Sequence, residues 1–211
     1  MPLRVTQLYR LDANASALTR HFDCWAGDDP WAGNYIAPGN FAPVITAGRE
    51  FIAGPKKGRG QHRMVPRIWG VPPPPSAHDV TRGITAVRNA DSPFWIGNLR
   101  NSEFRCLVPA TSFMEWGTGI DVEGRRNRHI FQCGDQPIFA FAGVWKDSEI
   151  PTFAILTCPA IGRLRAIGCE RMPVILPPDR ASQDVWLHGG WDRAKTLTSP
   201  QADIQLPEIS G

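Results

Sequence analysis

The sequence lacks several features that would place it in a specialised class of protein. No run approaches the roughly 18 apolar residues that a membrane helix needs, and the first residues lack the charged and then apolar pattern of a secretory signal. The five cysteines are odd in number and widely spaced, and no Cys-x-x-Cys pair occurs, which argues against a disulfide framework or a zinc ribbon. We therefore expect a cytoplasmic protein with reduced cysteines and no membrane partner.

An excess of charge of one sign is also missing. The 211 residues include 23 Lys and Arg against 20 Asp and Glu, a formal net charge of +3, and 42% of the residues are hydrophobic. These values exclude a disordered acidic or basic chain. The 20 glycines and 20 prolines predict many turns and short strands, and the length suits one domain over residues 1–211.

The local patterns predict an α+β domain, in which a curved, largely antiparallel and barrel-like sheet carries peripheral helices. Ser92 before Pro93 predicts a helix over 94–100, and Asp12 or Asn14 can cap a helix within 13–22. Asp179 can cap a further helix, and 160–167 is helical in pattern. Strands are expected at 41–45, 51–53, 64–69, 104–108, 112–116, 129–133, 138–145, 152–157 and 172–176.

One acid lies in unusual surroundings for a carboxylate. Glu115 follows Phe113 and Met114 and precedes Trp116 on a predicted strand, where Phe113 and Glu115 share one face. Desolvation would raise the pKa of Glu115 and suit it to general acid/base chemistry. The alternative is a structural ion pair with an arginine such as Arg88.

A cysteine and the histidines are the other candidate reactive groups. Cys169 lies beside Arg171, whose charge favours a thiolate and hence a nucleophile; an inert thiol at a turn is the alternative. No pair of histidines has metal-ligand spacing, so the sequence predicts no metal site and no cofactor. The histidines are His21, His62, His78, His129 and His188.

Positive charge is concentrated in two places although the net charge is small. Residues 49–67 hold six basic side chains, and residues 125–128 hold three. Such patches attract polyanions, because neutralised phosphates release counterions. Solvated loop side chains are the alternative interpretation.

Three sequence blocks, in this order, resemble the SOS-response-associated peptidase (SRAP) family, whose members recognise abasic sites in single-stranded DNA. The resemblance covers about residues 6–188 and leaves 189–211 as a short tail. The blocks are Arg105-Cys106-Leu107-Val108-Pro109-Ala110 with Phe113-Met114-Glu115-Trp116, then Phe139-Ala140-Phe141-Ala142-Gly143-Val144-Trp145, then Arg171-Met172-Pro173-Val174-Ile175-Leu176-Pro177 before Trp186-Leu187.

The resemblance implies a covalent reaction with DNA. A cysteine exposed by removal of the initiator methionine condenses with the aldehyde of the abasic sugar to a thiazolidine, and an asparagine, a glutamate and a histidine assist. The glutamate matches Glu115. Arg88 and Arg171 match arginines suited to phosphate contacts, with Asn89 beside Arg88. Trp69 is a candidate platform for base stacking, with a buried strand-end tryptophan as the alternative.

The remaining reactive positions depart from the family pattern. Thr6 occupies the cysteine position, Ala86 the asparagine position and Cys169 the histidine position. An amine at Pro2, an amine freed by cleavage before Thr6, or the Cys169 thiol remain as possible nucleophiles. We therefore predict a monomeric, divergent SRAP-like protein that binds abasic sites in single-stranded DNA. The alternatives are an enzyme that uses Glu115 and Cys169 on a peptide or small substrate, and a noncatalytic scaffold.

Overall fold

The strands of the protein form two sheets in a computed structural model that describes residues 8–26, 31, 33–48, 62–77, 82–120, 122–134, 136–201 and 204–209. The five-stranded sheet runs in the order β13 (Glu208–Ile209), β9 (Arg126–Phe131), β8 (Ser112–Ile120), β1 (Leu8–Leu11) and β3 (Asn34–Ile36). The eight-stranded sheet runs β12 (Arg171–Pro173), β11 (Thr152–Pro159), β10 (Phe139–Lys146), β7 (Arg105–Ala110), β4 (Phe41–Thr46), β5 (His62–Trp69) and β2 (Cys24–Trp25), with β6 (Ala86–Val87) beside β11.

The α+β class is as predicted, but the chain forms two sheets rather than one curved sheet: the five-stranded sheet is antiparallel and the eight-stranded sheet is mixed. Three pairings are parallel, namely β2 with β5, β5 with β11 and β6 with β11. Since β5 also pairs with β4, the pairings lead from β11 through β10, β7, β4 and β5 back to β11. All residues of β7 are buried, which explains why this strand has a continuous apolar run instead of an alternating pattern.

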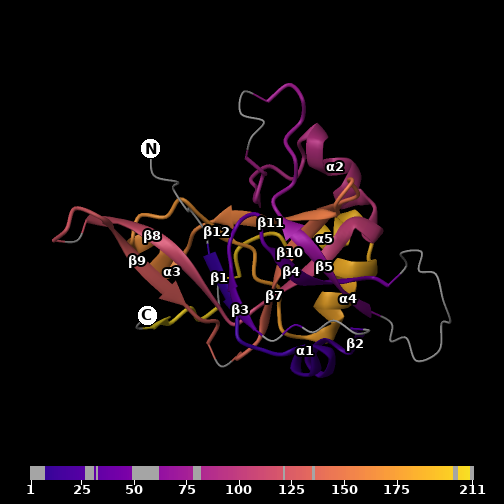
Figure 1. Ribbon diagram of the computed structural model, residues 1–211, viewed down its shortest axis with the longest axis horizontal. Coiled ribbons are helices and arrows are strands. Elements are labelled where there is room, and N and C mark those ends of the chain that lie inside the picture. Colours follow the sequence, from indigo (N-terminus) through magenta and orange to yellow (C-terminus); the bar gives the residue numbers. More distant parts are fainter. Residues whose placement is uncertain are drawn as a thin grey trace.

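The helix starts that the sequence indicates after Asn14, Ser92 and Asp179 are confirmed, the helix expected over 160–167 is shorter, and the helix over 191–196 was not expected. Figure 1 places the β8–β9 hairpin at the left and helices α2, α4 and α5 at the right. Asn14, rather than Asp12, caps α1 by accepting a hydrogen bond from the Ala17 amide at 2.9 Å. The helices are α1 (Ala15–Phe22), α2 (Pro93–Arg100), α3 (Gly162–Ala166), α4 (Arg180–His188) and α5 (Trp191–Thr196). Within the described part of the chain, no helix has the length and apolar character needed to span a bilayer.

Several predicted boundaries differ from the structure. The segment 189–211 is not a tail, because α5 buries Trp191 and Ala194 and β13 pairs with β9. The strand expected at 104–108 begins one residue later, after a 3-10 turn over Ser102–Phe104. The strand expected at 51–53 lies outside the described residues.

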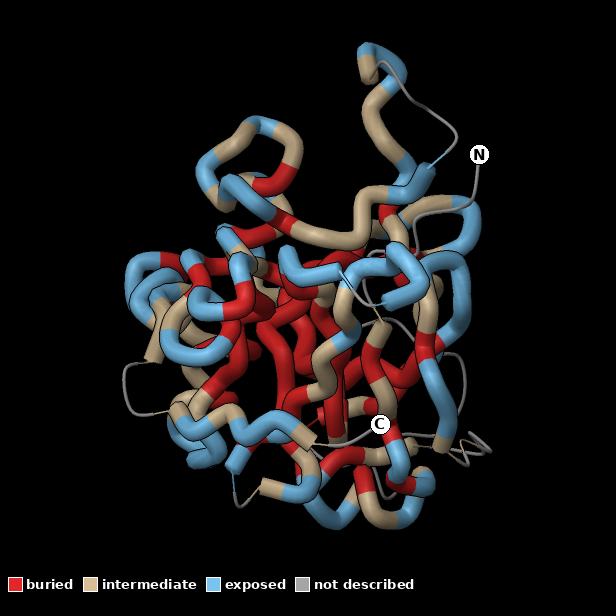
Figure 2. The backbone as a smooth tube through the Cα atoms, turned by 90° about the vertical axis from the view of Figure 1, so that its left-hand side faces the viewer, coloured by how far each residue is buried: buried red, intermediate tan, exposed pale blue. Residues whose placement is uncertain are grey.

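The core joins the two sheets through aromatic side chains. Tyr9 of β1 contacts Trp69 of β5 and Phe141 of β10 edge-on, at ring-centroid distances of 5.2 and 5.9 Å. Phe113 of β8 packs on Phe141 in the same way at 5.7 Å. Each such pair contributes about 0.5–1.5 kcal/mol beyond burial. Figure 2 shows these buried segments at the centre of the molecule, with exposed loops around them.

Candidate functional site

A polar pocket of about 630 Å³ lies where β6, β8 and the segment before β12 meet. Its wall includes five positions that the sequence analysis identified, namely Ala86, Arg88, Glu115, Cys169 and Arg171. These residues come from three separate stretches of the chain, so only tertiary folding brings them together. Small-molecule sites have volumes of about 300–1,000 Å³, so the pocket can hold a group as large as a sugar with its phosphate.

Glu115 is the buried acid of this pocket. It lies on β8 with 8% of its surface exposed, and burial raises its pKa to about 8. The predicted ion pair with Arg88 is not present, and the Glu115 carboxylate has no hydrogen-bond or ion-pair partner among the described residues. A carboxylic acid that is mostly protonated at neutral pH can donate a proton to a ligand.

Cys169 faces the same pocket, but its surroundings do not favour a thiolate. Burial raises the pKa of the Cys169 thiol to about 11, the nearby Glu115 adds to the rise, and Arg126 opposes it. Arg171, which the sequence suggested as the activating charge, instead opposes the burial-driven rise in the pKa of Cys158. The Cys169 thiol lies 3.9 Å from the Trp116 carbonyl oxygen, to which it donates a weak hydrogen bond.

Three arginines line the pocket and differ in their engagement. The exposed Arg88 lies at the end of β6. Arg171 donates from Nε to Thr157 Oγ1 at 2.8 Å and from Nη2 to the Arg88 carbonyl oxygen at 3.0 Å, so it braces the backbone that carries Arg88. Arg126 donates to the Gly117 carbonyl oxygen at 2.9 Å. The pocket wall therefore carries positive charge beside a neutral acid.

Of the residues predicted to contact DNA, Trp69 is buried, whereas Asn89 is exposed and makes a local hydrogen bond. Trp69 is only 2% exposed, and its indole N–H donates to the Thr85 carbonyl oxygen at 3.0 Å. It cannot stack on a base, so the alternative of a buried strand-end tryptophan is correct. The Asn89 side chain accepts a hydrogen bond from the Asp91 amide at 3.0 Å and so shapes the turn before α2.

The start of the described chain lies next to Glu115. Leu8 pairs with Met114 in the β1–β8 register, and Leu8 and Glu115 together line a small cavity adjoining the pocket. Pro2 and Thr6 lie outside the described residues. Strand β1 therefore begins beside Glu115, and Pro2 and Thr6, the two residues predicted to supply an amine, precede this strand in the sequence.

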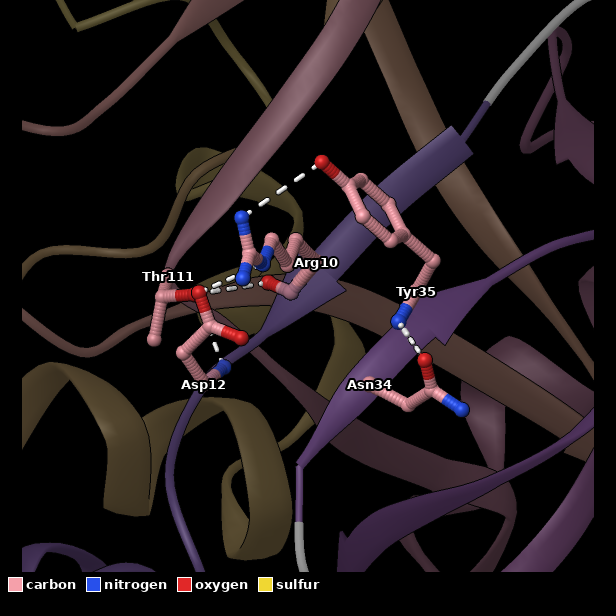
Figure 3. Close-up of polar contacts among 5 residues, drawn as sticks. All are labelled: Arg10, Asp12, Asn34, Tyr35 and Thr111. Atoms are coloured by element: carbon pink, nitrogen blue, oxygen red, sulfur yellow. Dashed lines mark hydrogen bonds and ion pairs between the residues drawn. The ribbon is translucent and has the colours of Figure 1, made fainter. Parts of the chain in front are cut away.

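Polar contacts hold β1 in this register (Figure 3). Thr111 Oγ1 donates to the Arg10 carbonyl oxygen at 2.9 Å and accepts from the Asp12 amide at 3.0 Å. The Arg10 guanidinium pairs with Asp12 at 2.6 Å and lies over the Tyr35 ring at 4.8 Å. These contacts join β1 to β3 and to the turn between β7 and β8.

The basic clusters make local contacts where the structure describes them. Arg63 lies over the Trp25 ring at 5.6 Å and Arg67 over the Trp145 ring at 4.7 Å. Arg125 pairs with Glu123 at 2.5 Å. Arg49, Lys56, Lys57 and Arg59 lie outside the described residues, as does His78.

The sequence analysis missed a grouping of metal-ligating side chains. His62, Asp184 and His188 each place a ligand atom within 4.8 Å of the others. The sequence predicts no metal site because no pair of histidines has ligand spacing along the chain, and the structure brings these three side chains together from separate elements. The signal that was available is the four-residue spacing of Asp184 and His188, which puts both on one helix face. His62 and His188 are 126 positions apart, and no sequence pattern connects them.

Comparisons with known proteins place the chain in a family. A family model described as SOS response associated peptidase (SRAP) matches residues 7–210. No curated protein matches the sequence. A solved protein from Bordetella bronchiseptica is similar, with a TM-score of 0.71 and 17% identity, covering 97% of this chain and 99% of that one.

Two further solved structures have similar folds. A protein from Bacteroides thetaiotaomicron has a TM-score of 0.71 and 18% identity, covering 96% of this chain and 91% of that one. A phage-related protein from Bordetella bronchiseptica has a TM-score of 0.67 and 18% identity, with 97% and 94% covered. At these low sequence identities, the similarity to the three solved structures shows a shared fold and nothing more. Since the family model spans nearly the whole chain, this protein belongs to the SRAP family.

Proposed function

We propose that the protein binds single-stranded DNA at an abasic site and that the Glu115 pocket receives the baseless sugar. SRAP membership connects the chain broadly with the DNA damage response. The observation that carries the proposal is the desolvated Glu115, whose pKa burial raises to about 8, in a pocket that it shares with Arg88, Arg126 and Arg171. A protonated acid among cations suits a ligand that is an aldehyde flanked by phosphates.

The proposed chemistry uses an amine at the start of the chain in place of the family's cysteine. Once Met1 has been removed, the secondary amine nitrogen of Pro2 attacks the sugar aldehyde carbon, its proton moves to the oxygen, and the addition product is a carbinolamine. Glu115 protonates the carbinolamine hydroxyl, water leaves, and an iminium ion forms. Hydrolysis reverses the step, so the adduct is a reversible cap on the lesion.

A chain cut before Thr6 would supply a primary amine for the same reaction, forming an imine. Two residues of chain span at most about 7 Å, so the covalent chain limits how far Thr6 can lie from Leu8. Leu8 itself borders the cavity that Glu115 lines. Mass analysis of the adduct distinguishes Pro2 from Thr6 as the attached residue.

The alternative of a Cys169-based hydrolase receives no support from the site. Burial raises the pKa of Cys169 to about 11, so the thiol is protonated at neutral pH and is a weak nucleophile. Among the described residues, no histidine lines the pocket with Cys169 to act as its base.

Borohydride trapping tests the covalent step. Purified protein is incubated with single-stranded DNA that carries one abasic site, and cyanoborohydride reduces any iminium or imine to a stable amine. We expect a one-to-one adduct whose peptide mass maps to the amino-terminal residue, and at least a tenfold lower rate with Glu115→Gln. An adduct that maps elsewhere, or no adduct at all, contradicts the amine route.

A salt titration tests DNA binding separately from covalent chemistry. Binding through phosphate contacts weakens steeply between about 50 and 200 mM salt. Arg88→Ala should weaken binding several-fold, whereas Arg100→Ala, an exposed arginine at the end of α2, should not. Equal effects of both substitutions would show that the pocket is not the DNA site.

A further inference from the structure

Three side chains suited to metal ligation meet outside the Glu115 pocket. His62 is the first residue of β5, and Asp184 and His188 lie on α4. His62 Nε2 lies 3.1 Å from His188 Nε2 and 3.3 Å from Asp184 Oδ1. We propose that these three residues bind a divalent transition-metal ion, with Zn²⁺ the best match, and so fasten α4 to β5.

The separations agree with the geometry of a tetrahedral site. Bonds of about 2.0–2.2 Å from zinc to nitrogen or oxygen, at angles near about 109°, place neighbouring ligand atoms about 3.3–3.5 Å apart. The measured separations of 3.1 and 3.3 Å lie close to this value. The Asp184 and His188 ligand atoms lie within 4.8 Å of each other, so side-chain shifts, of a few tenths of an ångström for the two pairs that include His62, let an ion enter.

A hydrogen bond outside the cluster decides which ring nitrogen of His62 carries the proton in the neutral ring. His62 Nδ1 lies 3.4 Å from the Phe22 carbonyl oxygen, which can only accept, so Nδ1 carries the proton. The lone pair of the neutral ring is then on Nε2, directed at Asp184 and His188. Histidine ligands of metal sites are usually oriented by such a carbonyl or carboxylate partner. The ring is also 2% exposed, which fixes its orientation by packing.

The Asp184 carboxylate adds an independent observation. Its Oδ1 atom is buried and accepts no hydrogen bond from the described residues, although it lies 3.3 Å from His62 Nε2. A buried anionic oxygen beside a ring nitrogen is unfavourable unless a proton on that nitrogen or a bound cation lies between the two atoms. A metal ion bound at this point supplies that cation.

The elements that carry the cluster are held in place. Asp179 caps α4 by accepting from the Ser182 amide at 2.8 Å, and the Trp186 indole donates to the Cys106 carbonyl oxygen of β7 at 2.9 Å.

Two imidazoles and one carboxylate favour zinc and its neighbours over Mg²⁺ or Ca²⁺, which prefer oxygen ligands. Three protein ligands leave one tetrahedral position for water.

A zinc titration tests the proposal. Untagged protein is stripped with a chelator, dialysed and titrated with Zn²⁺ in competition with a chromogenic chelator. We expect one equivalent bound and a rise in Tm of several degrees, because the ion binds the folded state. Asp184→Asn and His188→Gln should each weaken binding at least tenfold. His21→Gln, an exposed histidine of α1, should leave binding unchanged, and Mg²⁺ should not compete.

The result that overturns the proposal is the absence of stoichiometric zinc binding by folded protein, or equal binding by all variants. If His188→Gln does not fold, as judged by circular dichroism, the near-isosteric Asp184→Asn decides the outcome, because its side chain is 38% exposed. No DNA is used, so the result is independent of the function proposed for the Glu115 pocket.

Discussion

Glu115 and Glu208 lie on opposite sides of strand β9, and their surroundings differ in almost every respect. Glu115 stands across from His129 in the β8–β9 register, and Glu208 reaches the same histidine from β13. Glu208 is paired with His129 at 2.7 Å and with Arg163 at 3.0 Å, and its side chain is 31% exposed. The hydrogen bond from His129, with help from Arg163, holds the pKa of Glu208 below its usual range.

Glu115 is buried without such a partner among the described residues, and burial raises its pKa to about 8. Both acids are glutamates, so residue type does not explain the difference. Their position in the packed sheet does, because β8 lies inside the sheet and β13 forms its edge. A paired acid stabilises the fold, whereas an unpaired buried acid costs stability and gains reactivity.

The largest expected effect comes from Glu115→Gln. The folded pKa of about 8 lies above the ordinary value of 4.5, so wild-type stability decreases as pH rises from about 4.5 to 8. Glutamine has no proton to lose. The variant should therefore gain on the order of 4 kcal/mol relative to wild type at pH 9 and almost nothing at pH 4. Urea unfolding at both pH values measures this, with the exposed Glu149→Gln as control; a pH-independent difference would show that Glu115 is not desolvated.

Cys169 tests whether the same pocket suppresses thiol ionisation. A pKa raised by burial from 9.0 to about 11 lowers the thiolate fraction at pH 8 about a hundredfold. Alkylation of Cys169 should therefore be about a hundredfold slower in folded than in urea-unfolded protein. Peptide mass spectrometry resolves it from the four fully buried cysteines. Fast labelling in the folded state would restore Cys169 as a nucleophile.

Trp69→Phe tests whether the aromatic wall behind Glu115 is core. The change removes the hydrogen bond to the Thr85 carbonyl oxygen and leaves a small void. It should cost about 2 kcal/mol of unfolding free energy and leave DNA affinity unchanged at temperatures where the variant is folded. Lower affinity with unchanged stability would assign Trp69 to base stacking after all.

The smallest effect is expected for Glu208→Gln. Because the pKa of Glu208 is lowered in the folded state, its contribution is present above about pH 4.5 and is lost as pH falls. The variant should be about 0.5–1 kcal/mol less stable at pH 7, with a smaller loss at high salt and a smaller loss at pH 3. An effect of equal size at pH 3 would mean that packing of β13, rather than charge, is responsible.

The sequence alone determined the element types with good accuracy. Asn14 and Asp179 predicted two helix starts, because a side-chain oxygen that caps a helix acts within three residues. Glu115 between Phe113 and Trp116 predicted a buried acid, because alternation along a strand is also local. The segment after residue 188 was wrongly expected to be a tail, since the pairing of β13 depends on β9, which is more than 70 residues away in the sequence.

Only the tertiary structure decided what surrounds each reactive side chain. It buried Trp69 with its indole N–H bonded to the backbone, turned the Arg171 guanidinium toward backbone carbonyl oxygens and placed Cys169 beside Glu115. It also joined His62 to Asp184 and His188 across more than a hundred residues of chain. Solvation and charge act through space over a few ångströms, and distance along the chain does not record that proximity.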